Sequence, residues 1–207
     1  MRIIETKVYK YEELSDSAQE KARDWYRQDG LGYDWWDTCY EDFARFAEIL
    51  GIGLSQKAVP LMNGKCRYEP EIYFTGFYHQ GSGSSFVGKY SYAKGAVAKI
   101  KAYAPQDEEL HRIAYELQDI QRKHFYRLEA RITSRRDAAI SVDVYDREDP
   151  YKDVGDAESE LTDLMNDFND WMYYRLRDEY EYLTSDEAVA ESIVANEYEF
   201  DEDGNWV

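Results

Sequence analysis

Hydrophobic and polar residues alternate in some segments and recur at helical spacing in others, which divides the chain into predicted elements. Residues 2–9 alternate and have high β-propensity, so they predict a strand. Residues 14–28 and 34–50 place large apolar side chains at helical spacing and predict two helices. The polar run Ser15 to Glu20 suits a helix start, and Gly51 is a natural C-terminal cap.

The middle of the chain predicts strands with one helix between them. Strands are expected in four segments rich in β-branched and aromatic residues: 71–78, 84–92, 128–133 and 139–145. A helix is expected over residues 107–123. A Gly- and Ser-rich turn at 79–83 joins the first two strands, and a basic turn at 134–137 joins the last two.

The end of the chain predicts a long helix over residues 156–183, a short helix to about residue 196, and a strand with a tight turn near Asp203. Strands and helices occur in blocks, and neighbouring strands can pair as hairpins. We therefore expect an α+β fold in which an antiparallel sheet has helices packed on one face and a long acidic C-terminal helix follows. No linker is evident, so residues 1–207 are expected to form a single domain.

Charge is distributed unevenly along the chain. The net charge is −18, and residues 148–207 hold 20 acidic and 3 basic residues, a net of −17. Residues 1–147 hold 23 acidic and 22 basic residues, a net of −1. Such an acidic segment would repel nucleic acid and membranes and would attract basic partners.

Five carboxylates within the long predicted helix share one face. They are Asp156, Glu160, Asp163, Asp167 and Asp170. At a rise of 1.5 Å per residue the row spans roughly 21 Å, with about 5 Å between neighbours. Phosphates along a nucleic-acid strand are spaced about 3.4 Å apart, so a rigid carboxylate row could occupy a basic channel built for nucleic acid. No Lys or Arg occurs between Asp153 and Asp170, although a solvated helix face remains the alternative interpretation.

The loop within residues 77–86 is a second candidate site. Its backbone N–H groups could hold an anion, with side chains that could contact a ligand or a partner. Those side chains are His79, Gln80, Ser82, Ser84 and Ser85. The loop has no phosphate-binding motif and leads into a strand instead of a helix, so a plain hairpin connection is the alternative.

Other chemistry has little support in the sequence. The three histidines are scattered, no metal-binding spacing occurs, and neither a catalytic motif nor a cofactor motif is present, so we expect no metal and no cofactor. Cys39 and Cys66 are isolated and are predicted to be small buried residues in a reducing compartment. No membrane span or signal peptide is evident, which favours the cytoplasm. Arg135 and the basic residues around it could neutralise the acidic segment of the same or another subunit, which leaves a homodimer open, or they could contact nucleic acid weakly.

Three stretches resemble a family of uncharacterised bacteriophage and prophage proteins, some of them labelled antitoxin-like. The stretches are residues 33–43, residues 72–86, and residues 183–188 together with 195–200. The family pattern carries an Asp where this chain has Ser82. The resemblance implies a mobile-element setting in a bacterial host and supplies no agreed activity.

These observations favour an interaction protein over an enzyme. The leading hypothesis is a phage-encoded acidic inhibitor of a host nucleic-acid-binding machine used in defence or repair, including CRISPR enzymes, through nucleic-acid mimicry. Its partner would be a basic host protein, and no direct contact with nucleic acid is expected. One alternative is an antitoxin-like protein that neutralises a partner through an apolar patch such as Trp35 and Trp36. The other is an enzyme or small-ligand binder that uses the loop at residues 77–86.

Overall fold

The computed structural model describes residues 7–62, 64–135 and 139–207, which form two compact units. Unit 1 combines residues 1–36 with residues 177–207, and unit 2 comprises residues 37–176. The long helix α5 (Ala157–Leu183) contributes residues to both units. Each unit is described separately below, and the single domain expected from the sequence stays a prediction.

The sheet of unit 2 has four antiparallel strands in the order β2-β7-β8-β9. Their bounds are Ile52–Leu54, Gly88–Ser91, Leu128–Arg135 and Ala139–Asp146. The strands β8 and β9 form the predicted hairpin, in which Ala130 pairs with Val144 and Ile132 with Val142. Ala130, Ile132 and Val144 are buried, so the alternation in the sequence correctly identifies the inner face.

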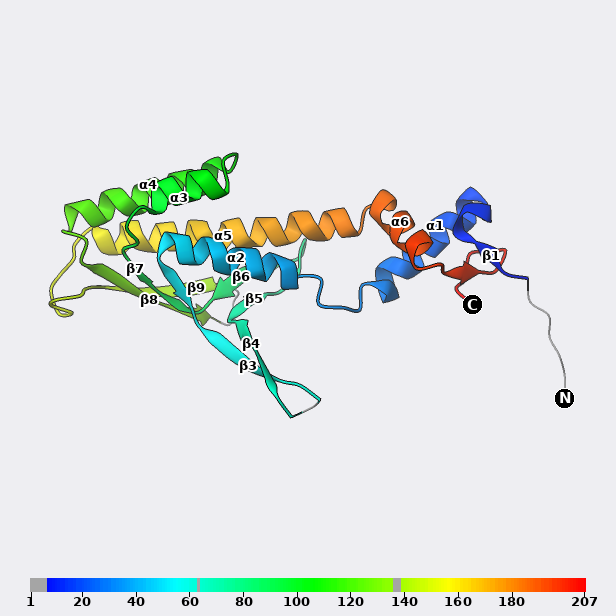
Figure 1. Ribbon diagram of the computed structural model, residues 1–207, viewed down its shortest axis with the longest axis horizontal. Helices are drawn as coiled ribbons and strands as arrows, with labels where there is room; N and C mark the ends of the chain where they lie inside the picture. Colours follow the sequence, from blue (N-terminus) through cyan, green and yellow to red (C-terminus); the bar gives the residue numbers. More distant parts are fainter. Residues whose placement is uncertain (1–6, 63, 136–138) are drawn as a thin grey trace. The chain divides into compact units, whose positions relative to one another are not determined.

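Three strand pairs meet at a backbone junction between the sheet and two hairpins. The N–H of Ser55 donates to the carbonyl of Val87 (2.8 Å). The N–H of Val87 donates to the carbonyl of Glu71 (3.0 Å), and the N–H of Glu71 donates to the carbonyl of Ser55 (2.8 Å). On the far side of these three hydrogen bonds, β3 (Gln56–Pro60) pairs with β4 (Cys66–Pro70), and β5 (Ile72–Phe74) pairs with β6 (Ser84–Phe86). The β3–β4 hairpin therefore leaves the sheet as a separate arm (Figure 1).

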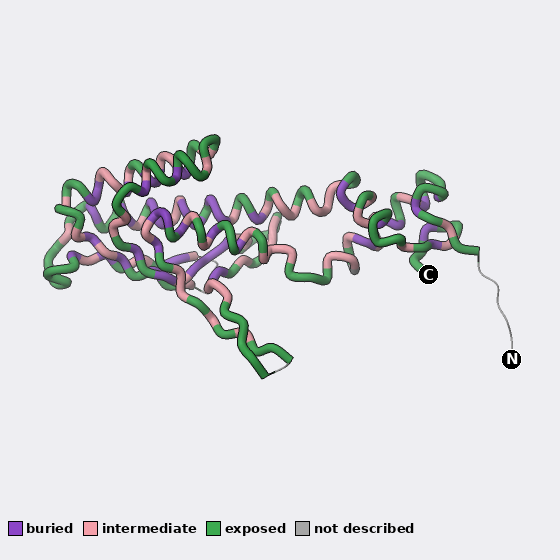
Figure 2. Tube along the Cα trace, in the orientation of Figure 1, coloured by how far each residue is buried: buried purple, intermediate pink, exposed green. Residues whose placement is uncertain are grey.

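All helices of unit 2 lie on the same side of the four-stranded sheet (Figure 1). They are α2 (Asp37–Leu50), α3 (Ala96–Tyr103), α4 (Glu108–Lys123) and the unit 2 part of α5. Aromatic side chains join α5 to its neighbours: Phe168 meets Phe86 edge-on at 5.9 Å, and Trp171 meets Phe43 at 5.5 Å between ring centroids. Buried positions recur along α5 and along the sheet strands (Figure 2). The α+β fold with helices on one face is confirmed.

Unit 1 packs two short helices around a small aromatic core. α1 (Asp16–Trp25) and α6 (Asp186–Ala195) each begin at a serine cap, and β1 (Tyr9–Lys10) pairs with β10 (Glu199–Phe200). Buried residues of the core come from both ends of the chain: Tyr11, Leu14, Ala18, Ala22, Tyr26, Val189, Ile193 and Phe200. The ring of Trp25 stacks on Trp206 at 5.1 Å, which fastens the C-terminal turn to α1.

Several predicted boundaries differ from the structure. The first helix ends at Trp25 and continues as a π-helical turn over Tyr26–Gly30, and the expected strand at 71–78 is paired only over Ile72–Phe74. Helix α3, strand β2 and the β3–β4 hairpin were not predicted. Most of the expected strand at 2–9 and residues 136–138 of the basic turn lie outside the described residues.

Two further expectations concern single residues and membranes. The prediction that both cysteines are buried is wrong, because Cys66 is exposed on β4 and Cys39 is half-buried on α2; an outward position on a two-stranded arm has no core to fill. The tight turn near Asp203 is confirmed, since the Asp201 carboxylate accepts from the backbone N–H of Asp203 and Asn205. Within the described part of the chain, no helix has the length and apolar character of a membrane span.

Candidate partner-binding surface

Four of the five predicted carboxylates project from one face of α5. Asp156 directly precedes the helix, whereas Glu160, Asp163, Asp167 and Asp170 lie within it. The opposite face is buried, as its apolar spacing predicts: Leu161, Leu164, Met165, Phe168, Trp171, Met172 and Leu176. Burial of this stripe fixes the rotation of the helix, so the carboxylate face is turned away from the core.

Helix α4 lies alongside this face and encloses a groove of about 440 Å³, called here the acidic groove. Five carboxylates line it, two from α4 and three from α5: Glu116, Asp119, Glu160, Asp163 and Asp167. Two cations also line it, Arg112 and Lys123, so the groove carries a net of three negative charges. The carboxylates therefore form two rows on two helices instead of the single row expected from the sequence.

Arg112 joins the two rows. Its guanidinium donates to Glu116 at 2.9 Å, to Glu109 at 2.5 Å and to Asp167 at 2.6 Å. The hydrogen bond from Arg112 lowers the pKa of Glu109 below its usual value. The absence of cations in the sequence around α5 is thus misleading at Asp167, because the compensating charge comes from a helix 55 residues earlier in the chain.

The other carboxylates of the row have different surroundings. Glu160 and Asp163 are exposed, line the acidic groove and form no ion pair with any residue that the structure describes. Asp170 lies outside the groove, and partial burial, followed by repulsion from Asp167, raises its pKa. The part of the row best suited to a basic partner is therefore Glu160 and Asp163.

Asp107 positions α4 against α5. One carboxylate oxygen caps α4 by accepting from the N–H of Leu110 at 3.0 Å. The other accepts from the indole N–H of Trp171 at 2.9 Å and from Arg175 at 3.1 Å, both on α5. The contact spans 64 residues of sequence, so the sequence shows the cap but not the link between the helices.

The predicted loop site divides into an exposed turn and a buried strand. His79, Gln80 and Ser82 lie in an exposed or half-buried turn closed on itself, in which the N–H of His79 donates to the Ser82 hydroxyl at 3.1 Å. Ser84 and Ser85 belong to β6 and are buried. The Ser84 hydroxyl donates to the Asn169 carbonyl at 2.9 Å, and the Ser85 hydroxyl bonds to that of Ser134 at 2.8 Å. The two buried hydroxyls join β6 to its neighbours and do not face a ligand at the surface.

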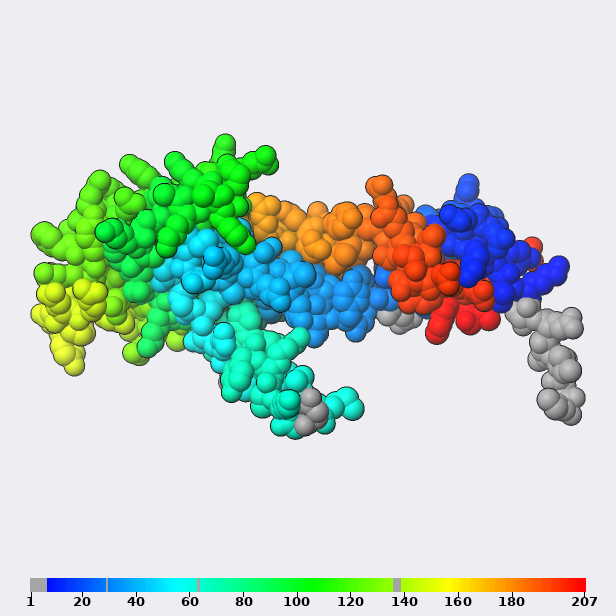
Figure 3. Space-filling model, in the orientation of Figure 1, coloured from blue at the N-terminus to red at the C-terminus, as the bar shows by residue number. Residues whose placement is uncertain are grey.

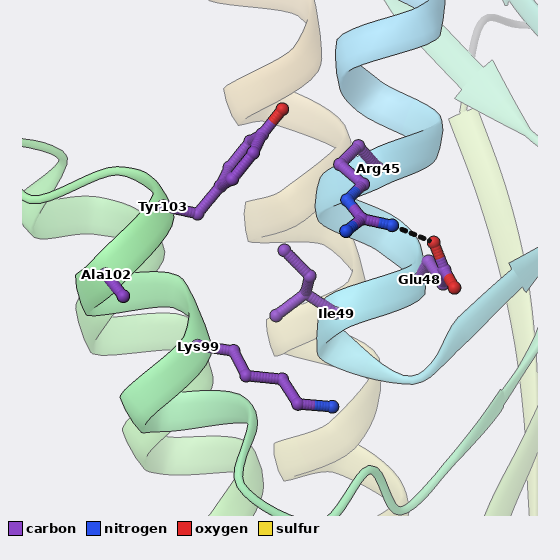
Figure 4. A pocket seen from close by; sticks show the side chains of 6 residues that line it. All are labelled: Arg45, Glu48, Ile49, Lys99, Ala102 and Tyr103. Atoms are coloured by element: carbon purple, nitrogen blue, oxygen red, sulfur yellow. Dashed lines mark hydrogen bonds and ion pairs between the residues drawn. The ribbon is translucent and has the colours of Figure 1, made fainter.

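A second hollow of about 370 Å³ lies between α2 and α3 (Figure 4). Figure 4 shows Ile49 near its centre, with Arg45 directed at Glu48 and Lys99 extending beneath Ile49. The charged groups are spread around the rim and do not converge on one point. No cluster of three metal-ligating side chains occurs among the residues that the structure describes.

The apolar pair proposed for an antitoxin-like function lies in unit 1. Trp35 and Trp36 are half-buried, and their rings meet edge-on at 5.6 Å. Trp35 also packs against Tyr180 at 5.8 Å. These rings therefore contribute to packing within unit 1, and their half-buried faces do not make a large exposed patch.

The sequence reasoning missed the contribution of α4 to the surface. Glu109, Glu116 and Asp119 share one face of the predicted helix at spacings of three, seven and ten residues. That periodicity is visible in the sequence and could have indicated a second acidic face. Its alignment with α5 could not be read from the sequence, because it depends on tertiary packing.

The fold and groove define an α+β protein with an acidic surface formed by two adjacent helices. Residues 35–186 match the model of a family described as a domain of unknown function (DUF8835), which covers more than half of the chain. The protein therefore belongs to this family. The matched range contains all of unit 2 and with it the acidic groove. No curated protein and no solved structure matches the chain.

Proposed function

We propose that this protein is an acidic interaction protein whose groove between α4 and α5 occupies the nucleic-acid channel of a basic partner protein. The observation that carries the proposal is the pair of carboxylate rows facing one groove, with only two cations among its lining residues. Both cations already contact carboxylates: Arg112 bonds to Asp167, and Lys123 lies 3.2 Å from Asp119.

Helix geometry makes this surface suitable for a channel that binds phosphates. Glu160, Asp163 and Asp167 recur at intervals of three and four residues, which places neighbouring carboxylates about 5 Å apart along α5. Glu116 and Asp119 repeat the spacing on α4. A channel lined by Lys and Arg would meet two lines of negative charge on a rigid scaffold, in place of two phosphate strands. The partner would be a host nucleic-acid-binding enzyme of defence or repair in the proposed phage setting.

The mechanism is competition by charge and shape, with no chemical step. Exposed charges interact over a Debye length of about 10 Å at 0.1 M salt and only about 3 Å at 1 M salt. Association should therefore be fast and strongly weakened by salt. The partner should lose nucleic-acid binding when this protein occupies its channel.

The test compares two double charge reversals of equal net charge. The first, Glu160→Lys with Asp163→Lys, alters the acidic groove, and the control, Glu41→Lys with Asp42→Lys, alters exposed positions of α2. The wild-type chain captures its partner from a host lysate at about 0.1 M salt. The purified partner is then titrated with labelled DNA and RNA in the presence of each variant.

The groove variant should lose most of the capture and competition measured at about 0.1 M salt, whereas the control should keep both. Capture by the wild type should fall steeply between about 0.1 M and 1 M salt. Equal competition by the groove variant and the wild type, or a complex that nucleic acid neither displaces nor prevents, would refute the proposed function.

A further inference from the structure

The segment after α4 has a backbone conformation that its residues rarely adopt. Phe125 and Tyr126 have φ angles of 55° and 60°, in the left-handed region that glycine occupies most readily. The N–H of Tyr126 donates to the carbonyl of Gln121 at 2.7 Å, and that of Phe125 to Arg122 at 3.4 Å. These two bonds form a Schellman motif, whose left-handed position after the helix is usually glycine. Here that position holds Phe125.

Packing does not explain why a phenylalanine occupies this position. The Phe125 side chain is 77% exposed, and the guanidinium carbon of Arg127 lies 5.9 Å from its ring centroid. Tyr126 is anchored instead, because its ring packs on Tyr92 at 4.5 Å. The backbone thus holds Phe125 outward at a conformational cost that burial of the ring does not offset. Unfavourable backbone conformations of this kind concentrate at functional sites.

A second exposed aromatic residue lies on the neighbouring segment. Arg127 pairs with Glu148 at 2.9 Å, and the N–H of Arg147 donates to the Arg127 carbonyl at 2.9 Å, so the two segments run side by side. Figure 3 shows them adjacent at one end of unit 2, in green and yellow. Tyr151, on the second segment, is 98% exposed. Phe125, Tyr126 and Tyr151 are called here the aromatic end.

The aromatic end adjoins the acidic groove. Lys123 is the last residue of α4 and lines the groove, and Phe125 follows it by two residues. Asp156 and Glu160 mark the start of α5 directly after the Tyr151 segment. Phe125 thus follows the Lys123 edge of the groove, and the segment that carries Tyr151 leads into Asp156 and Glu160.

We infer that the aromatic end inserts into an apolar pocket of the partner protein and that Lys or Arg side chains border this pocket. Exposed aromatic anchors beside charge are typical of residues that dominate binding energy. The charged border follows from complementarity with the groove next to the rings. The inference rests on the proposed function and adds a contact that salt does not screen.

The principal variant is Phe125→Gly, because glycine suits the left-handed position. We expect its thermal midpoint to equal or exceed that of the wild type, while its Kd for the partner purified by wild-type capture rises at least about tenfold. Tyr151→Ser should weaken binding in the same direction. Tyr68→Ser removes another exposed ring (67%) from the β3–β4 arm and should leave the Kd unchanged.

Salt separates this inference from the proposed function. Binding that persists at about 1 M salt should disappear in Phe125→Gly, whereas the groove reversals should remove the salt-sensitive part. A Phe125→Gly variant that binds like the wild type overturns the inference and leaves the proposed function standing. Binding that depends on Phe125 but not on Glu160 and Asp163 overturns the proposed function and, with it, the Lys or Arg border of the pocket. A lower thermal midpoint for Phe125→Gly overturns the inference, whereas a wild-type chain that captures no partner overturns both the inference and the proposed function.

Discussion

Replacement of Asp107 by alanine tests the contact that aligns α4 with α5. The Asp107 carboxylate caps α4 at Leu110 and accepts from Trp171 and Arg175 of α5. If these bonds hold the two helices together, their loss should lower the free energy of unfolding of unit 2.

The expected cost follows from three separate contributions. Loss of an N-terminal cap costs about 1 kcal/mol. The indole N–H of Trp171, a residue only 7% exposed, would lose its acceptor at a cost of about 1–3 kcal/mol. Arg175 is half-exposed, so its ion pair adds less than about 1 kcal/mol. Asp107→Ala should therefore lower the free energy of unfolding by about 3 kcal/mol.

Urea unfolding followed by tryptophan fluorescence measures this difference, with two matched variants. Asp107→Asn keeps one carbonyl acceptor, which can serve the cap or the indole but not both well, so its cost should be about half. Glu108→Ala removes a neighbouring exposed carboxylate of the first turn and should cost less than about 0.5 kcal/mol. If Asp107→Ala costs no more than Glu108→Ala, Asp107 does not align the helices, and the geometric basis of the acidic groove is lost.

Two further predictions concern pH and have opposite signs. Burial raises the pKa of Asp170, so the ionised carboxylate destabilises the folded state. Asp170→Asn should therefore raise the thermal midpoint at about pH 7. This gain should vanish as the pH falls below about 4, where the carboxyl group is protonated in both the folded and the unfolded state. Backbone hydrogen bonds, first from the N–H of Glu148, lower the pKa of Asp146, so its ionised carboxylate stabilises the folded state. Asp146→Asn should therefore lower the thermal midpoint at about pH 7. This decrease should become smaller below about pH 4, where the wild-type carboxyl group becomes protonated as well. Calorimetry over pH 3–8 checks both, and equal differences at all pH values would contradict them.

The sequence predicted the elements whose burial is periodic along the chain. Ala130 and Ile132 alternate on β8, and the apolar stripe of α5 from Leu161 to Leu176 repeats over about four turns, so local spacing alone identified them. It did not predict the junction at Ser55, Glu71 and Val87, where three short strand pairs meet through backbone hydrogen bonds. Backbone groups are the same for every residue type, so such a junction leaves little pattern in the side chains.

The acidic site was predicted only in part, because some of its contacts are local in the sequence and others are not. The spacing of Glu160 and Asp163 is local and was read correctly as one helix face. The contact of Arg112 with Asp167 joins residues 55 positions apart and could be seen only in the fold. Phe125 did leave a signal, because the predicted helix at 107–123 is followed by no glycine in the next seven residues. A helix end without glycine is informative when the residue in its place is large and apolar.

Helix α4 connects stability and binding because its parts have different neighbours. Its first turn is fastened to α5 through Asp107, so changes there should act on unfolding. Arg112, further along α4, bonds to Asp167 of α5 and so sets the spacing of the acidic groove, and changes there should act on both properties. The end of α4 holds Phe125 outward, without burial, so changes there should act on binding alone. Substitutions at Asp107, Arg112 and Phe125 should therefore weaken binding progressively more and stability progressively less. A uniform acidic surface would not produce this gradient.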